Sequence, residues 1–151
     1  LVRHLLGQLQ LPLEKVVTVP QEISAEESRA LLETIKRLPD AECGRVMTTI
    51  SRLGSRPARL LESALPSPGE VRKLLLALGI VRGPHLIVMD EPTNHMDLPG
   101  ILCLEEALAD CPCAVLLVSH DEAFLDKITT TDWLLTRDAA GDTRLAITAV
   151  R

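Results

Sequence analysis

The strongest structural signal in this sequence lies in residues 86–97, which read LIVMDEPTNHMD. The first four residues form an uninterrupted apolar run, which is typical of a strand buried on both faces of a parallel sheet. Asp90 and Glu91 follow directly, so two adjacent carboxylates stand at the carboxyl end of that strand. Open α/β sheets bind their ligands at this edge. The stretch therefore predicts an α/β fold with a functional site beside Asp90 and Glu91.

Two further strands are predicted on either side of this stretch in the chain. A second apolar run, residues 114–118, predicts another buried strand and ends in Ser119 and His120. A β-branched run, residues 16–19, comes shortly before Gln21. Strands that alternate with helices in this way predict a mostly parallel sheet. Neighbouring parallel strands end at the same edge, so we expect Gln21 and His120 to face the same crevice as the two carboxylates.

Helical signals fill the segments between these strands. Capping boxes begin at Ser24 and Ser67, and a third begins at Ser119. Asp40 is a candidate N-cap for another helix. Residues 22–66 carry helical signals without a strand signal, so we interpret them as a helical insertion carried by the sheet. The remaining predictions are a helix at residues 1–9, a helix at about 98–109, and two weaker strands around 133–136 and 145–150.

The polar residues at the three predicted strand ends have complementary chemistry. Asp90 is suited to hold Mg²⁺, directly or through water, and Glu91 can orient and deprotonate an attacking water. His120 is placed to reach the phosphate that this water attacks. Gln21 is a neutral side chain that can contact both the metal and the water. Each residue alone is a weak signal, whereas the three strand ends together predict one shared site.

The composition excludes several classes of function. Asp and Glu number 21 against 16 Lys and Arg, a net charge of −5, which argues against a nonspecific nucleic-acid binder. We also expect no sequence-specific DNA binding. Phe124 and Trp133 make up the whole aromatic content, which excludes an aromatic stacking platform. No apolar run approaches the roughly 20 residues of a membrane span. We expect a cytoplasmic chain whose four cysteines are free thiols.

The order and spacing of these motifs resemble the later part of an ATP-binding-cassette (ABC) nucleotide-binding domain, and specifically the ABC-F class. The resemblance covers nearly the whole chain. Residues 90–97, DEPTNHMD, resemble the ABC-F form of the Walker B end and the D-loop. The other matching segments are the Walker B strand at residues 86–90, the Q-loop at 20–22, the signature motif at 66–70, and the switch-histidine region at 118–121 with Phe124 and Leu125.

This resemblance implies a role for each residue at the strand ends. Glu91 is the implied general base, Asp90 the magnesium carboxylate, and His120 the sensor of the γ-phosphate. Gln21 is the implied contact to the metal and the water. The implied activity is ATP hydrolysis, with ATP and Mg²⁺ as cofactors.

The resemblance also implies partners. In the family, ATP is held between two cassettes, either in tandem in one protein or as a dimer. Ser67 and Gly69 would then serve the nucleotide held by the partner's phosphate loop, and Asp97 would act across the pair. For the ABC-F class the ribosome is a further implied partner.

The implied architecture is a P-loop-NTPase-like α/β fold. Residues 1–21 and 67–151 would form a RecA-like ATPase core, and residues 22–66 the helical subdomain. The core is partial, because the sequence contains no G-x-x-x-x-G-K-[ST] phosphate loop, the Walker A motif. We expect the chain to begin just past that loop and to have negligible ATPase activity alone.

The signature motif departs from the family pattern at two positions. Pro68 stands where the family usually has glycine, and Pro66 where it usually has leucine. Proline removes one backbone donor from the phosphate contact, but it also favours the start of a helix, whose N-terminus attracts phosphate.

Several of these residues have a simpler interpretation. Asp97 is also a suitable cap for the following helix, and Ser67 caps a helix whether or not it contacts ATP. His95 is interpreted as structural or exposed rather than catalytic. Four arginines without an acidic neighbour form either a solvated helical face or a contact with ribosomal RNA or protein. They are Arg45, Arg52, Arg56 and Arg59.

Two other functions compete with the ABC-F ATPase. The same chemistry serves the ATPase subunit of a membrane ABC transporter, in which the helical subdomain docks on a membrane protein. The missing phosphate loop and the altered signature are also compatible with a noncatalytic interaction module derived from a cassette. The presence of both Glu91 and His120 argues against that module, because a site without turnover has no need of a base and a sensor together.

Overall fold

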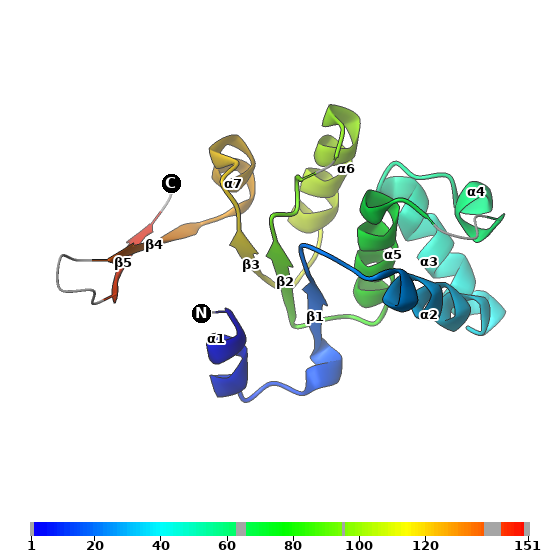
Figure 1. Cartoon of the computed structure of the whole chain (residues 1–151), viewed down its shortest axis with the longest axis horizontal. Helices are drawn as coiled ribbons and strands as arrows, with labels where there is room; N and C mark the ends of the chain where they lie inside the picture. The colour runs from blue at the N-terminus through cyan, green and yellow to red at the C-terminus, as the bar shows by residue number, and fades with distance from the viewer. Residues whose placement is uncertain (1, 63–65, 95, 138–142, 150–151) are drawn as a thin grey trace.

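The three predicted strands form one parallel sheet in the computed structural model, which describes residues 2–62, 66–94, 96–137 and 143–149 (Figure 1). The strand order is β1 (Val16–Val19), β2 (Leu86–Asp90), β3 (Ala114–Val118), so β2 is central. In register, Val19 lies beside Met89, and Asp90 lies beside Val118. The ends of the strands therefore share one edge. We call it the carboxyl edge, and it comprises Gln21, Asp90, Glu91, Ser119 and His120.

The central strand is buried, whereas β3 is half-exposed. Ile87 is fully buried in β2, and Val88 is 2% exposed. In β3, Val118 is 39% exposed and the middle residues are only half-buried. The prediction that residues 114–118 form a second buried strand is therefore wrong in its burial. Like β1, β3 is an edge strand of the described sheet, but α5 packs against β1, on the other side of the central strand.

Helix α5 (Pro68–Val81) packs against β1 and connects the sheet to the other helices. It begins with the predicted capping box, in which Ser67 Oγ accepts from the Glu70 amide and the Glu70 carboxylate accepts from the Ser67 amide. Gly79 lies directly against Val17. A Cβ at Gly79 would stand 2.4 Å from Cγ2 of Val17, so this close approach requires glycine.

Three helices lie on the side of α5 away from the sheet (Figure 1). They are α2 (Ala25–Lys36), α3 (Asp40–Arg52) and α4 (Pro57–Glu62), and the last was not predicted individually. The described part of residues 22–66 contains no strand, as expected. Its division from the rest of the chain as a subdomain stays a prediction. The side chains that these helices contribute to the common core are Leu32, Ile35, Val46, Ile50 and Leu60.

The other helices are α1 (Val2–Gln8), a short 3-10 turn η1 (Leu13–Lys15), α6 (Leu98–Ala109) and α7 (Glu122–Ile128). The last two pack against each other, and α6 matches its predicted span. Within the described ranges, no helix combines the length and the apolar character needed to cross a membrane.

Two of the predicted helix caps are wrong. Asp40 is the first residue of α3 rather than its cap, and Pro39 occupies the cap position without a side-chain hydrogen bond. The box predicted at Ser119 does not form. Instead, Asp121 caps α7 by accepting from the Phe124 amide at 3.1 Å, and Ser119 Oγ accepts from the amide of Asp121. An aspartate two residues nearer the helix thus takes the place of the serine.

The last two strands form an antiparallel hairpin, β4 (Thr131–Arg137) and β5 (Thr143–Ala149). Both strands were predicted, but the predicted range for β4 is shorter than the strand, and the predicted range for β5 is shifted toward the C-terminus. Every described residue of the two strands is exposed. Residues 138–142, which join the two strands in the sequence, lie outside the described residues. The hairpin extends from one end of the molecule, at the left of Figure 1.

Candidate functional site

The carboxyl edge brings Glu91 and His120 together. Nε2 of His120 lies 3.5 Å from Oε1 of Glu91. The side chain of Glu91 is 13% exposed, whereas that of His120 is 99% exposed. A partly buried carboxylate therefore faces an imidazole that is open to solvent. Such a pair presents a proton acceptor and a hydrogen-bond donor side by side to a small ligand.

A buried arginine, which the sequence analysis missed, ties the strand ends together through their backbone. Arg72 lies in the second turn of α5 and is 5% exposed. Its guanidinium donates to the carbonyl oxygens of Gln21, Glu91 and Asn94. The Asn94 contact measures 3.0 Å. Two loops distant in the sequence, one after β1 and one after β2, are thus held by one side chain, which fixes them relative to each other.

Burial lowers the pKa of the Arg72 guanidinium, and the nearby charge of Asp90 acts in the opposite direction. An arginine keeps its proton even when its pKa is lowered, so the site contains one permanent buried cation. Three carbonyl acceptors and an adjacent carboxylate compensate that charge. The local sequence does not single out Arg72, because Lys73 stands beside it in the same helix.

Glu91 has an unusual backbone. Its φ is +46°, in the left-handed region that non-glycine residues rarely adopt. Its amide donates to the carbonyl oxygen of Val118 at 2.7 Å, which extends the β2–β3 pairing one residue beyond the strand. Sparsely populated backbone conformations are found often at functional sites, where the surrounding structure maintains them. Here the Val118 and Arg72 contacts hold the amide and the carbonyl of the same residue.

Asp90 and Gln21 fit a magnesium ion by their chemistry. Both side chains are exposed at adjacent strand ends, and both offer oxygen atoms, the donors that Mg²⁺ prefers. Among the described residues, no group of three or more His, Cys, Asp or Glu is placed to hold a metal by itself. This is compatible with Mg²⁺, which usually takes one or two protein ligands and completes its shell with water and substrate phosphates.

The remaining predicted site residues belong to helix starts. Besides its cap contacts, Ser67 Oγ donates to the Glu70 carboxylate at 2.9 Å, and Gly69 lies in the first turn of the same helix. Asp97 Oδ1 accepts from the Gly100 amide at 3.1 Å and caps α6. No contact described here joins these residues to Glu91 or His120, so they form a second group of predicted site residues.

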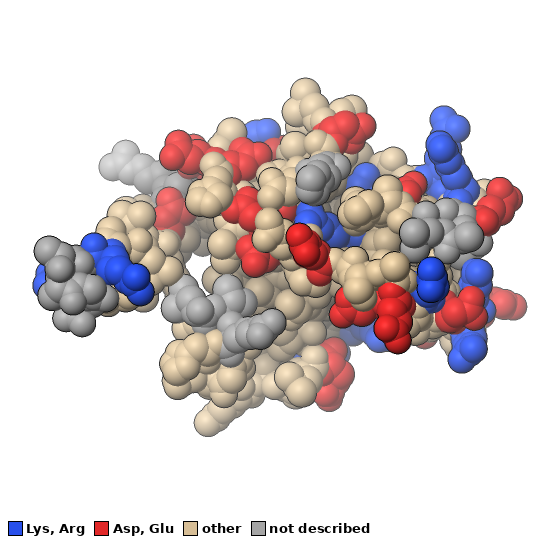
Figure 2. All heavy atoms as spheres, in the orientation of Figure 1, with Lys and Arg blue, Asp and Glu red and all other residues tan. Residues whose placement is uncertain are grey.

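His95 lies outside the described residues, and its interpretation is not tested. The four arginines singled out in the sequence are all exposed, namely Arg45, Arg52, Arg56 and Arg59. One of them, Arg52, forms an ion pair of 2.7 Å with Asp110. Figure 2 shows basic and acidic side chains interspersed over the region of α2–α4, at the right of the view. This mixture of charges favours the interpretation of a solvated helical face.

The sequence matches no protein-family profile, but it is similar to several individual proteins. ATP-binding protein Uup of Caulobacter vibrioides is 48% identical over 63 residues, which cover 42% of this chain and 10% of Uup. Energy-dependent translational throttle protein EttA of Mycobacterium tuberculosis is 42% identical over 72 residues, 48% of this chain and 12% of EttA. Zinc import ATP-binding protein ZnuC of Paracoccus denitrificans is 34% identical over 140 residues, 80% of this chain and 53% of ZnuC.

The matched part of the chain thus spans between about a tenth and about half of the length of these relatives. Solved structures give the fold. The ATP-binding subunit of an ABC transporter superposes with a TM-score of 0.58 and 22% identity, over 78% of this chain and 53% of that one. The RNase-L inhibitor superposes with a TM-score of 0.62 and 19% identity, over 90% of this chain and 28% of that one. These likenesses confirm the predicted fold class.

Proposed function

Because the homologues and structural neighbours of this chain are ABC ATP-binding proteins, ABC-F members among them, we propose that it is part of an ATP-hydrolysing cassette of an ABC-F protein. The observation that carries this proposal is the 3.5 Å approach of Glu91 and His120 at the ends of adjacent parallel strands. Uup and EttA, the ABC-F relatives, match at higher identity than ZnuC, although over shorter segments.

Each residue of the carboxyl edge has a different role in hydrolysis. Glu91 accepts a proton from the attacking water at its carboxylate, which stays partly shielded from bulk solvent. His120 is exposed and turns its imidazole toward a phosphate oxygen. Asp90 and Gln21 would hold Mg²⁺, which would neutralise charge on the phosphates. Arg72 does not contact the reacting atoms and acts by positioning the backbone of Gln21 and Glu91.

These 151 residues carry no phosphate loop, so residues outside them would supply the backbone amides and the lysine that hold the phosphates of ATP. We assign residues 1–21 and 67–151 to the ATPase core and residues 22–66 to the helical subdomain. Ser67, Gly69 and Asp97 face a second cassette, in tandem or in a dimer. The chain acts in the cytoplasm, and the ribosome is its partner, in keeping with the translational role in the name of EttA.

The proposal is tested with Glu91→Gln in the natural gene product that contains these residues. ATP hydrolysis should fall by about 100-fold or more, because proton abstraction by a positioned base contributes about that much. Binding of ATP should persist. Glu106→Gln is the matched control, since it makes the same chemical change at an exposed position of α6. Unchanged hydrolysis in Glu91→Gln contradicts the role of Glu91, and absence of ATP binding in the wild type favours a noncatalytic module.

A transporter subunit is the second candidate, and the likeness to ZnuC over 80% of this chain supports it. The same residues would then hydrolyse ATP, and the helical segment would contact a membrane protein. Fractionation of cells that produce the natural gene product distinguishes the two. Sedimentation with ribosomes supports the ABC-F assignment, whereas recovery with membranes supports the transporter.

A further inference from the structure

Two cysteines lie in contact at the edge of the sheet opposite the carboxyl edge. Cys111 and Cys113 belong to the connection between the end of α6 and the start of β3. Their sulfur atoms are 3.0 Å apart, and both side chains are half-buried. Cys43 and Cys103 are also half-buried. Among the described residues, only the first two cysteines lie within hydrogen-bond distance of each other.

The backbone explains why these two sulfurs meet. The amide of Cys113 donates to the carbonyl oxygen of Cys111 at 2.8 Å, which closes a three-residue γ-turn centred on Pro112. An inverse γ-turn needs a central φ of about −75°, and the proline ring holds φ near about −65°. Proline thus favours the conformation that places the flanking side chains together. A contact from outside also fixes the end of the turn, since the amide of Ala114 donates to the backbone carbonyl oxygen of His85 at 3.0 Å.

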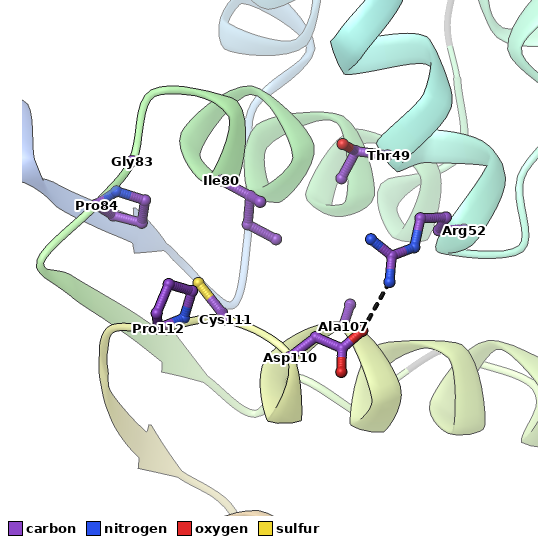
Figure 3. A pocket seen from close by; sticks show the side chains of 9 residues that line it. All are labelled: Thr49, Arg52, Ile80, Gly83, Pro84, Ala107, Asp110, Cys111 and Pro112. Atoms are coloured by element: carbon purple, nitrogen blue, oxygen red, sulfur yellow. Dashed lines mark hydrogen bonds and ion pairs between the residues drawn. The ribbon is translucent and has the colours of Figure 1, made fainter.

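A hollow of about 180 Å³ gives small molecules access to one of the two thiols. Figure 3 shows Cys111 and Pro112 on one side of this hollow, with the ion pair between Arg52 and Asp110 on another. A water molecule occupies about 30 Å³ of liquid, so the hollow is large enough for hydrogen peroxide. Cys113 does not line it.

We propose that Cys111 and Cys113 form a reversible redox pair that closes to a disulfide when a peroxide enters this hollow. The Cys111 sulfur attacks one peroxide oxygen, the O–O bond breaks, and the other oxygen leaves as water after taking up the thiol proton. Cys111 is then a sulfenic acid. The Cys113 sulfur displaces its hydroxyl group, which leaves as a second water with the Cys113 proton. Two thiols lose two electrons, and one peroxide gives two waters.

The order of the two steps follows from the surroundings of each thiol. Burial raises the pKa of the Cys113 thiol to about 12, with smaller contributions from the hydrogen bond and the charge of Cys111. Cys113 is therefore a poor nucleophile toward peroxide near neutral pH, and it does not line the hollow, so Cys111 is the sulfur that meets the peroxide and Cys113 closes the disulfide afterwards. Since a disulfide bond is about 2.05 Å long, the sulfurs need to approach by only about 1 Å.

The experiment exposes the folded chain to hydrogen peroxide, alkylates the remaining thiols, and cleaves before aspartate. This cleavage places the pair in the peptide 110–120, Cys103 in 97–109 and Cys43 in 40–89. The pair peptide should lose about 2 Da and regain it with dithiothreitol. It should react at least about tenfold faster than the other two cysteines, because its second thiol is already in place.

Two variants identify the role of each sulfur. Cys113→Ser should accumulate a sulfenic acid at Cys111 that dimedone traps, whereas Cys111→Ser should leave Cys113 as a thiol. Oxidation of Cys43 and Cys103 at the same rate as the pair would overturn the proposal, and so would disulfides between chains or an unmodified pair. The wild-type result does not depend on whether either serine variant folds.

Discussion

The parallel sheet and the β4–β5 hairpin are built from similar residues but differ in what covers them. Ile87 in β2 is fully buried, whereas Ile147 in β5 is 61% exposed. Both lie in paired strands, opposite Val115 and Trp133 respectively. Strand pairing alone therefore does not remove an apolar side chain from water. A second layer does, and helix α5 contributes that layer beside β1 in the sheet.

The two isoleucines give the largest expected contrast. Ile87→Ala should lower the free energy of unfolding by about 2–5 kcal/mol, because it leaves a cavity in a closely packed core. Urea unfolding followed by circular dichroism measures this change. A loss below about 1 kcal/mol would show that the core around β2 relaxes to fill the space.

The buried cation should come next in effect. Arg72→Met removes the donors to three carbonyl oxygens, and we expect a loss of about 2–3 kcal/mol, since each unsatisfied acceptor costs about 1–3 kcal/mol and water replaces part of the loss. Lys73→Met is the matched control on the same helix and should stay within about 0.5 kcal/mol. Equal losses in the two variants would contradict the role of Arg72 in holding the loops after β1 and β2 in place.

Gly79→Ala should have a smaller effect because two contributions oppose each other. Its Cβ would lie 2.4 and 2.6 Å from the two γ-carbons of Val17, and such overpacking costs about 1–3 kcal/mol. Replacement of glycine by alanine in a helix raises the free energy of unfolding by about 1 kcal/mol. We expect a net destabilisation of about 1 kcal/mol in a chemical denaturation curve. Gly44→Ala is the control, since nothing lies within 4 Å of a Cβ at Gly44 in α3; stabilisation by Gly79→Ala would show that Val17 moves freely.

The smallest effect is expected in the hairpin. Ile147→Ala should change the free energy of unfolding by no more than about 0.5 kcal/mol, because the side chain is already exposed. The same urea titration that is used for Ile87→Ala measures it. A loss that equals the loss in β2 would mean that a partner covers the hairpin in solution.

The sequence predicted the features that depend on local pattern. The apolar run of β2 with its two carboxylates, the three strand positions and the capping boxes at Ser24 and Ser67 all follow from residues close together in the chain. The cap predicted at Ser119 failed because Asp121 competes for the same helix start, and the cap predicted at Asp40 failed because α3 begins one residue earlier than expected.

Features that depend on distant contacts could not be predicted. Arg72 is one of two adjacent basic residues in the sequence, and its role depends on three carbonyl groups that the fold brings to it. The half-exposed state of β3 depends on its place in the strand order rather than on its composition. The contact between Cys111 and Cys113 likewise requires the γ-turn at Pro112, and the sequence shows only the spacing.

The proposal that three strand ends surround one nucleotide is tested most directly by adding Mn²⁺ and ATP to the natural gene product that contains these residues and recording amide NMR spectra. Mn²⁺ replaces Mg²⁺ at oxygen ligands and broadens nearby resonances. The amides of Gln21, Glu91 and His120 should lose intensity together, ahead of those in β4 and β5, and Asp90→Asn should weaken the effect at all three. Broadening of one of the three amides without the others, or equal broadening of the hairpin amides, would contradict a shared site at the carboxyl edge.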